Sequence, residues 1–322
     1  MTTTRSNQEP VISIVAPLYN EEAGIQMLCE RLASVMDAAP FPVEVVLVND
    51  GSRDQTPLLM AAQSMKDGRF TSVFLSRNHG HQLAVSAGIA VARGSKAIMI
   101  IDGDLQDPPE LMEEFFTHIE SGTDVVYAIR KKRKESFIKR QLYWAYYRTL
   151  KRIANLEIPV DSGDFSMISR RVADVMKSMP ESSRYLRGMR TWIGFKQIGV
   201  EYERAGRAAG ETKYTFKKLF ELAYNGIFNF SDFPVKIITR LGVYTILVSM
   251  LYMSYIFVKK FFFGGVPEGF TTLIFAVCLF SGVQMICLGF IGEYVLRIYN
   301  QVRERPLFII DKIVRNGQEE KA

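Results

Sequence analysis

The chain has 322 residues, of which 48% are hydrophobic and 23% charged, so it is long enough for one large or two smaller folded domains and is unsuited to wholesale disorder. The net charge of +6 is unevenly distributed, because residues 130–152 hold ten Lys and Arg against one Glu. Such a patch favours phosphate, in a lipid headgroup, a nucleic acid or a substrate, over an ordinary solvated face, where the signs usually mix. The first ten residues are polar, so we expect no cleavable signal peptide and a cytoplasmic N-terminal half.

Residues 11–204 alternate short apolar runs with stretches of helical periodicity, such as 54–67 and 80–93. The runs expected to be strands are VISIVA (11–16), VEVVLV (43–48), TSVFL (71–75), KAIMII (96–101) and DVVYAI (124–129). This order predicts an α/β domain with a mostly parallel, Rossmann-like sheet flanked by helices. Ligands bind beyond the C-terminal edge of such sheets. We therefore expect four polar clusters to meet there: PLYNEE, NDGSRD, SRNHGH and DGDLQD.

The acidic cluster after the fourth run is the strongest candidate for a metal site. Asp102 and Asp104 flank a glycine, and Gln106 follows. Alternate residues of an extended segment point the same way, so these three side chains can converge. Two carboxylates and a neutral oxygen, without His or Cys, suit Mg²⁺ or Mn²⁺. Asp107 and Glu110 lie beside two prolines and are instead expected to cap a helix.

Two further polar turns offer contacts to a nucleotide. Asp50, after the second strand, could accept a hydrogen bond from a base N–H, and Asn20 and Glu21 could reach the base or the ribose. Taken alone, each of these residues is equally suited to a turn or a cap.

Two long runs without charge predict transmembrane helices: residues 241–258 and 271–291. At about 1.5 Å per residue they reach roughly 27 and 31 Å, close to the thickness of the bilayer core. Residues 259–269 join them as a hairpin. Basic residues favour cytoplasmic termini: the flanks hold Lys236, Arg240, Arg297, Arg303, Arg305, Lys312 and Arg315, whereas the hairpin holds Lys259 and Lys260.

An apolar stripe precedes the first span. It consists of Phe216, Leu219, Phe220, Ala223 and Ile227, on one face of a helix expected over 215–230. An ordinary packed helix is the alternative, but the position just before a span favours an amphipathic helix at the membrane interface.

The motifs PxYNE, NDGSxD, SRNxG, DxDLQDPPE and GDF, in this order, resemble those of the family 2 glycosyltransferases of GT-A fold. With two C-terminal spans, the chain is most similar to the polyprenyl-phosphate glycosyltransferases. These include dolichyl-phosphate mannose synthases, bactoprenol glucosyltransferases and undecaprenyl-phosphate aminoarabinose transferases. GDFSMISR, MPESSRYLRGMRTWIGF and IGEYVLRIYNQVRERPLFI look closest to bactoprenol glucosyltransferases, and the likeness covers roughly residues 11–310.

The resemblance implies roles for the residues that match these motifs. It implies a site for the nucleotide of a UDP-sugar, lined by Pro17, Tyr19, Asn20, Glu21 and Asp50. It also implies a metal site for Mg²⁺ or Mn²⁺, formed by Asp102, Asp104 and Gln106. Asp164, in DSGDFS, matches the family's proposed catalytic aspartate. Phosphate contacts are implied for a basic loop, RAAGETKY, through Arg207, Gly210, Thr212 and Lys213, and for Arg130.

Two departures from close relatives concern the site: GDFS stands where many have GDFR, and GHQ where many have lysine or serine. His81, in GHQ, is interpreted first as a neutral residue at a helix start, and a phosphate contact is the alternative.

The implied reaction transfers a sugar from a UDP-sugar to polyprenyl (undecaprenyl) phosphate with inversion, for a cell-envelope glycan or lipid modification. Overall likeness favours glucose; an aminoarabinose or mannose donor is the alternative. The metal would neutralise the departing diphosphate. A phosphomonoester has a second pKa near 6, so a strong base is not required. Asp164 could take a last proton, orient the acceptor, stabilise positive charge near the sugar, or simply cap a strand.

Other functional classes explain less of the chain. A processive polysaccharide synthase would resemble others in a Q-x-x-R-W signature, which RGMRTW lacks, and would have more spans. A membrane-anchored binding protein without catalysis would not need Asp102, Asp104 and Asp164 together. A nucleic-acid binder explains the basic segment but not the two spans, so nucleic acid is not an expected partner.

The expected organisation is that of an enzyme of the inner (plasma) membrane whose catalytic domain lies on the cytoplasmic side. It comprises a polar N-terminal tail (1–10), a cytoplasmic GT-A domain (11–214), an interfacial helix (215–235), a transmembrane hairpin (236–296) and a cytoplasmic C-terminal tail (297–322). Gly282 and Gly289 in the second span permit close helix packing and leave a homo-oligomer open.

The basic segment yields a first prediction. Replacing Lys139, Arg140 and Arg148 together by Ser should weaken use of the lipid phosphate more than binding of the UDP-sugar, because these cations are expected to dock the lipid headgroup. Kinetics with varied acceptor, alongside a nucleotide binding isotherm, measure the two effects. Equal losses in both would contradict the assignment.

Overall fold

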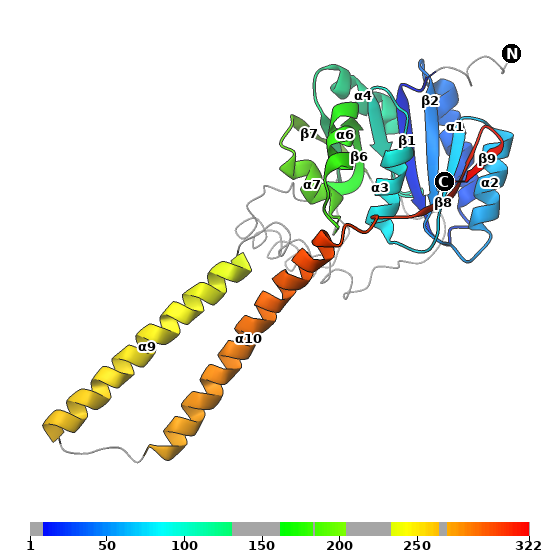
Figure 1. Ribbon diagram of the computed structural model, residues 1–322. Coiled ribbons are helices and arrows are strands. Elements are labelled where there is room, and N and C mark those ends of the chain that lie inside the picture. The colour runs from blue at the N-terminus through cyan, green and yellow to red at the C-terminus, as the bar shows by residue number, and fades with distance from the viewer. Residues whose placement is uncertain (1–8, 131–161, 183, 204–232, 264–268, 322) are drawn as a thin grey trace. The chain divides into compact units, whose positions relative to one another are not determined.

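The computed structural model describes residues 9–130, 162–182, 184–203, 233–263 and 269–321 (Figure 1). The chain divides into two compact units, an α/β unit that Pro306–Ala322 rejoins and a helical unit that contains Glu221–Arg305. Three sequence predictions lie outside the described residues: the interfacial helix over 215–230, the docking residues Lys139, Arg140 and Arg148, and the loop residues Arg207, Gly210, Thr212 and Lys213.

The α/β unit is built on one sheet whose nine strands run in the order β7-β5-β6-β4-β1-β2-β3-β8-β9. The bounds are β1 Ile12–Leu18, β2 Val43–Asn49, β3 Phe70–Leu75, β4 Ala97–Ile100, β5 Val125–Arg130, β6 Ser162–Ser169, β7 Gln197–Tyr202, β8 Ile310–Arg315 and β9 Gln318–Lys321. Only β6 and β8 run against the direction shared by the other described strands. The prediction of a mostly parallel sheet is confirmed.

Helices cover both faces of this sheet (Figure 1). They are α1 Ile25–Ala38, α2 Thr56–Lys66, α3 His81–Val91, α4 Met112–Glu120, α6 Arg170–Ser178 and α7 Leu186–Trp192, with a 3-10 turn η1 at Pro109–Leu111. β1 and β2 are buried at every position, which agrees with their mostly apolar sequences and with strands covered on both sides. α1 buries Ile25, Leu28 and Leu32, a helical spacing that faces the core.

The strand that carries Asp164 and the end of the chain differ from the sequence prediction. β6 carries Asp164 and inserts antiparallel between β4 and β5. The segment 297–322 was predicted to be a tail, yet β8 pairs antiparallel with β3, from Thr71↔Arg315 to Leu75↔Ile310. Residues 310–321 therefore belong to the sheet, because β3 would otherwise leave an edge of unpaired backbone groups that β8 satisfies.

The helical unit contains α9 Phe233–Phe263 and α10 Phe270–Val302. Both are long and apolar enough to cross a membrane, over Ile237–Lys259 and Leu279–Val302. Many of their large apolar side chains are exposed, among them Leu251, Phe257 and Phe261. The two predicted spans, 241–258 and 271–291, lie within these helices. Exposed apolar side chains are expected on helices that meet lipid.

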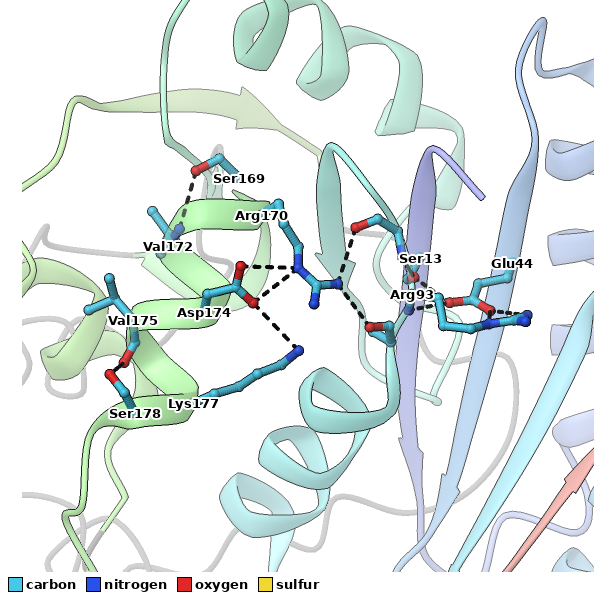
Figure 2. A network of polar contacts seen from close by, with 12 residues as sticks. Ser13, Glu44, Arg93, Ser169, Arg170, Val172, Asp174, Val175, Lys177 and Ser178 are labelled. Atoms are coloured by element: carbon cyan, nitrogen blue, oxygen red, sulfur yellow. Dashed lines mark hydrogen bonds and ion pairs between the residues drawn. The ribbon is translucent and has the colours of Figure 1, made fainter. Parts of the chain in front are cut away.

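A polar network anchors the C-terminal end of α3 (Figure 2). It lies at the N-terminal ends of β1 and β2, whereas the polar turns follow the C-terminal ends of these strands. Glu44 is 3% exposed and accepts hydrogen bonds from Ser13 Oγ (2.6 Å), from Arg93 N (2.6 Å) and from Arg93 Nε (2.8 Å). The same Ser13 oxygen accepts from Gly94 N at 2.6 Å. Arg170 adds a link from α6 by donating to the carbonyl oxygen of Ala92 at 3.1 Å. The C-terminal end of α3 is thereby tied to β1, β2 and α6.

Glu44→Ala should lower the free energy of unfolding by about 3 kcal/mol, because a buried hydroxyl and a backbone N–H lose their acceptor and Arg93 loses its partner. Thermal unfolding of the detergent-solubilised protein measures the change. Glu114→Ala on α4 is the matched control, because Glu114 is exposed and its loss should change stability by less than about 0.5 kcal/mol. Equal effects of the two variants would contradict the anchoring role of Glu44.

Candidate active site

The turns after β1 and β2 are joined by hydrogen bonds at the C-terminal edge of the sheet. Asn20 has a positive φ of 52°; its N–H donates to Ser52 Oγ at 3.0 Å and its Oδ1 accepts from Arg53 N at 2.9 Å. Glu21 N donates to Thr56 Oγ1 at 2.9 Å. Pro17 is buried near the end of β1, and Tyr19 is 36% exposed. Asn20 and Glu21 thus shape the edge as well as facing it.

Asp50 shapes the loop that leads into α3. Its carboxylate is 3% exposed and accepts hydrogen bonds from His79 N (2.7 Å) and Gly80 N (3.0 Å). Burial raises the pKa of Asp50, and these two amides oppose the rise. Gly51 has a φ of +65°, and a Cβ there would stand 2.4 Å from Asn78 N, so only glycine allows this approach. Asp50 therefore fixes the position from which α3 begins.

The acidic segment after β4 is a turn in which side chains alternate between inside and outside. Asp102, Asp104 and Gln106 are partly exposed, whereas the residues between them are buried. A Cβ on Gly103 would come within 2.4 Å of Leu18 Cδ2, so the turn passes tightly against β1. Gln106 N donates to Asp104 Oδ1 at 3.2 Å, and Leu105 has a φ of 59°. The three predicted ligands lie on the outer side, although the segment is not extended.

Asp107 and Glu110 have other contacts than those predicted. Asp107 is 2% exposed and accepts a 2.6 Å hydrogen bond from the hydroxyl of Tyr202 on β7. The helical turn after it begins at Pro109, and no side chain caps it, so the N-cap assignment of Asp107 is wrong. Glu110 instead pairs with Arg31 of α1 at 2.7 Å. Asp107 and Glu110 therefore bind side chains on β7 and α1 instead of capping the turn that follows them.

Asp164 lies at the centre of the edge and is the most heavily bonded carboxylate there. Its side chain is 7% exposed. Arg187 Nε donates to Oδ1 at 2.8 Å and Arg187 Nη2 to Oδ2 at 3.3 Å. Gln82 Nε2 donates to Oδ2 at 3.1 Å. Burial raises the pKa of Asp164, but the charge of Arg187, with His81, outweighs it and holds the pKa well below its usual value. Asp164 is therefore ionised at neutral pH.

His81 stands between two carboxylates, that of Asp164 on β6 and that of Asp102 in the turn after β4. Its Nε2 lies 3.4 Å from Asp164 Oδ2 and 3.7 Å from Asp102 Oδ1. Burial lowers the pKa of His81, but the hydrogen bond to Asp164 and the two negative charges raise it above its usual value. His81 starts α3, as its first interpretation has it, and its Nε2 faces the acidic cluster, whose negative charge favours the protonated form through the raised pKa.

Sequence reasoning missed three of the residues that complete this centre: Gln82, Arg187 and Arg190. Gln82 bridges elements, since it donates to Asp164 and accepts from Leu186 N at 2.9 Å through Oε1. The signal available was RGMR, in which two arginines three residues apart share one face of a short helix. Nothing in the sequence places that helix beside Asp164.

Two arginines near Asp164 carry guanidinium nitrogens without a hydrogen-bond partner among the residues described. Arg190 is 4% exposed, and its Nε and Nη2 are unpartnered in this sense. Its guanidinium carbon lies 5.6 Å from the ring centroid of Tyr127, and burial lowers its pKa to about 10. Arg130, at the end of β5, has a similarly unpartnered Nε, and its Nη2 lies 3.5 Å from the Cβ position of Gly163. Both cations border the carboxylate centre.

The acidic turn fits a hard divalent cation by its chemistry. In the part of the chain that the structure describes, no three His, Cys, Asp or Glu side chains are grouped to hold a metal. Asp102 and Asp104 are two carboxylates, however, and Gln106 adds an amide oxygen. Burial raises the pKa of Asp102 to about 6, and Asp107, Asp164 and Asp104 add to the rise. A cation would relieve this repulsion, and a substrate phosphate commonly completes such a ligand set.

Residues 13–176 match the family model described as Glycosyl transferase family 2. The chain belongs to this family. The match runs from β1 into α6 and so contains the acidic turn, His81 and Asp164. The resemblance drawn from the motifs is thereby confirmed, as is the fold class.

Relatives match nearly the whole chain. The uncharacterized glycosyltransferase YkcC of Bacillus subtilis is 43% identical over 301 residues, which cover 93% of each chain. The SfII prophage-derived bactoprenol glucosyl transferase of Shigella flexneri is 35% identical over 307 residues, covering 95% of this chain and 99% of the relative. The similarity therefore includes the two long C-terminal helices as well as the α/β unit.

Solved structures are similar to part of this chain at lower identity. A mannosyl-3-phosphoglycerate synthase from Rubrobacter xylanophilus has a TM-score of 0.44 and 16% identity, covering 67% of this chain and 71% of its own. A glucosyl-3-phosphoglycerate synthase from Mycobacterium tuberculosis has a TM-score of 0.41 and 18% identity, with 68% and 78% covered. At these scores nothing about the substrates of this chain follows.

Arg187→Met should destabilise the protein by about 3 kcal/mol at pH 7.5, because it leaves Asp164 buried without its main cation. The depressed pKa of Asp164 stabilises the folded wild type above the unfolded pKa of about 4, and this contribution is lost as the pH falls below it. In the variant, burial raises that pKa, so acid favours its folded state. The difference in Tm from wild type should therefore narrow between pH 7.5 and pH 5.

Lys177→Met is the control for this pair, since Lys177 also faces an aspartate but through a 3.7 Å contact to the 53% exposed Asp174. Its effect should stay below about 1 kcal/mol and should not depend on pH. A Tm difference for Arg187→Met that is the same at both pH values would contradict the assignment.

Proposed function

We propose that this protein transfers glucose from UDP-glucose to a polyprenyl phosphate, such as undecaprenyl phosphate, and inverts the anomeric carbon. The observation that carries the proposal is full-length similarity to proteins named bactoprenol glucosyl transferase, in a chain that joins a charged sheet edge to two apolar helices. A polyprenyl tail stays in the bilayer, so an enzyme for it needs both parts. The product would serve a cell-envelope glycan or a lipid modification.

The donor is proposed to lie along the edge formed by the turns after β1, β2 and β4. Pro17, Tyr19, Asn20, Glu21 and Asp50 would line the UDP site; Asp50 also holds the loop before α3 in place. Asp102, Asp104 and Gln106 would hold Mg²⁺ or Mn²⁺ against the diphosphate. When bound, the metal would neutralise the charge that develops on the leaving group. The raised pKa of Asp102 supports this role.

The phosphates of donor and acceptor are proposed to meet the basic groups around this edge. Two observations support such a contact for Arg130: it lies beside Gly163, and its Nε has no hydrogen-bond partner among the described residues. Arg207 and Lys213, in the loop with Gly210 and Thr212, would close over the diphosphate. Lys139, Arg140 and Arg148 would dock the lipid headgroup. Asp164 belongs to the reaction centre, because it joins His81 and Arg187 beside Asp102.

The membrane arrangement is proposed from charge. The two outer flanks of the spans together hold seven of the basic residues named above, whereas the hairpin holds two, and this difference favours cytoplasmic termini. The α/β unit, 11–214 together with 310–321, would then act on the cytoplasmic side of the plasma membrane, with the helix over 215–235 at the interface. The donor and acceptor are thus expected on the side where nucleotide sugars are made.

The assay for this function uses detergent-purified protein, undecaprenyl phosphate and a panel of UDP-sugars with Mg²⁺, Mn²⁺ or EDTA, with mass spectrometry of the lipid. Glucosylated lipid should form from UDP-glucose and disappear with EDTA. Asp104→Asn should lower kcat/KM by about 100-fold or more, as expected for lost stabilisation of the leaving group. Glu110→Gln is the matched control: it removes a carboxylate from the same segment, but from a surface pair with Arg31.

Each other outcome of this assay replaces part of the proposal. Product from another sugar donor, such as aminoarabinose or mannose, would replace glucose. Full activity in EDTA would remove the metal. Binding of UDP without product from any donor would favour a membrane-anchored nucleotide-binding protein.

A further inference from the structure

The carboxylate at the reaction centre is enclosed by donors rather than open to a substrate. Arg187 Nε occupies Oδ1 of Asp164 at 2.8 Å, and Arg187 Nη2 and Gln82 Nε2 occupy Oδ2 at 3.3 and 3.1 Å. His81 Nε2 lies 3.4 Å from the same Oδ2. A carboxylate has about four sites for such donors. Four donors from three residues therefore surround Asp164 before any substrate binds.

The exposure of these side chains shows which of them an incoming phosphate would meet. The side chain of Asp164 is 7% exposed, whereas that of Arg187 is 20% and that of His81 is 39% exposed. Arg187 and His81 therefore lie in front of the carboxylate of Asp164, which is the more deeply buried group. An acceptor phosphate approaching this surface is attracted by the guanidinium of Arg187 and meets donor groups before it meets Asp164.

The acceptor does not need a base at neutral pH. The second pKa of a phosphomonoester is near 6, so above that value the dianion predominates. Its oxygen can form the bond to the anomeric carbon while the bond from that carbon to the diphosphate breaks, and the bonding electrons leave with UDP. No proton changes place in this step, and the total charge is the same before and after it. A group that removes a proton from the acceptor is therefore not required.

We infer, resting on the proposed function, that Asp164 is a positioning residue: it orients the guanidinium of Arg187 and the imidazole of His81 toward the acceptor phosphate and takes no proton from it. Gln82 supports this arrangement from α3 by holding Asp164 and, through Leu186 N, the start of α7. The depressed pKa of Asp164 agrees with the geometry, since a carboxylate held ionised in this way is a weak base.

The test compares Asp164→Asn with wild type from pH 5.5 to pH 8.5, using undecaprenyl phosphate and the active UDP-sugar. A positioning role predicts a loss in kcat/KM of about 100-fold that is constant across this range, because Arg187 and His81 lose their anchor at every pH. A proton-accepting role predicts a loss that shrinks as the pH rises past 6, where the acceptor ionises unaided. The second result would overturn the inference.

Wild type and Asp164→Asn have the same charged groups facing residue 164: His81 from α3, Arg187 and Arg190 from α7, and Asp102 from the turn after β4. Repeating the comparison with His81→Asn in both proteins removes the titration of the imidazole from the profile. The constant ratio should persist in this background.

Two further variants keep the inference testable if Asp164→Asn folds poorly. Arg187→Lys keeps the charge but loses the two-pronged contact, and a positioning role predicts lower activity at every pH. If Asp164 were a base, this change would raise its basicity, and activity at pH 5.5 would be kept or increased. The kcat/KM of the double variant Asp164→Asn, Arg187→Met should lie within about 3-fold of that of the less active single variant, since both changes disrupt the same unit.

The outcomes separate this inference from the proposed function. No glycolipid from wild type, with any donor, would remove the proposed function and the inference with it. Glycolipid from wild type together with a loss in Asp164→Asn that disappears at high pH would remove the inference alone. Binding of UDP and a cooperative thermal unfolding transition above the assay temperature establish that each variant is folded.

Discussion

The structure of the α/β unit depends on holding several carboxylates together at one edge of a sheet. Burial raises the pKa of Asp102 to about 6, and the negative charges of Asp107, Asp164 and Asp104 add to the rise. Each buried member has its own compensation: Tyr202 binds Asp107, and Arg187 and His81 surround Asp164. Because these carboxylates need partners, the elements that carry the partners, β7, α7 and α3, lie beside this edge of the sheet.

The helix α3 shows how the scaffold keeps this edge in order. At its C-terminal end, Glu44 binds Arg93 and Ser13 in a buried network. At its N-terminal end, Asp50 holds the preceding loop, and His81 and Gln82 reach Asp164. Rigid packing lies between, because a Cβ on Gly88 would come within 2.3 Å of Val15. The reactive groups are thus carried by a helix that is fixed at both ends.

This arrangement gives a physical reason for chemistry with multiply charged substrates. A donor diphosphate and an acceptor phosphate repel each other, so bringing them together requires positive charge on both sides of the sugar. The acidic turn can recruit a cation for one side. Under the proposal, Arg187 and His81, oriented by Asp164, would meet the acceptor phosphate on the other side, and no proton would change place in the step.

The sequence by itself determined the elements whose signal is local. The five apolar runs are strands, the acidic turn follows β4, and two uncharged runs lie in the long helices α9 and α10. It also indicated the family, because ordered motifs carry that information. Only the tertiary structure decided that residues 310–315 pair with β3, that Asp107 binds Tyr202, and that Gln82, His81 and Arg187 enclose Asp164. These contacts join residues 20 to more than 200 positions apart, so no local pattern of hydrophobicity or charge encodes them, and the competition among their partners is settled only when the sheet is complete.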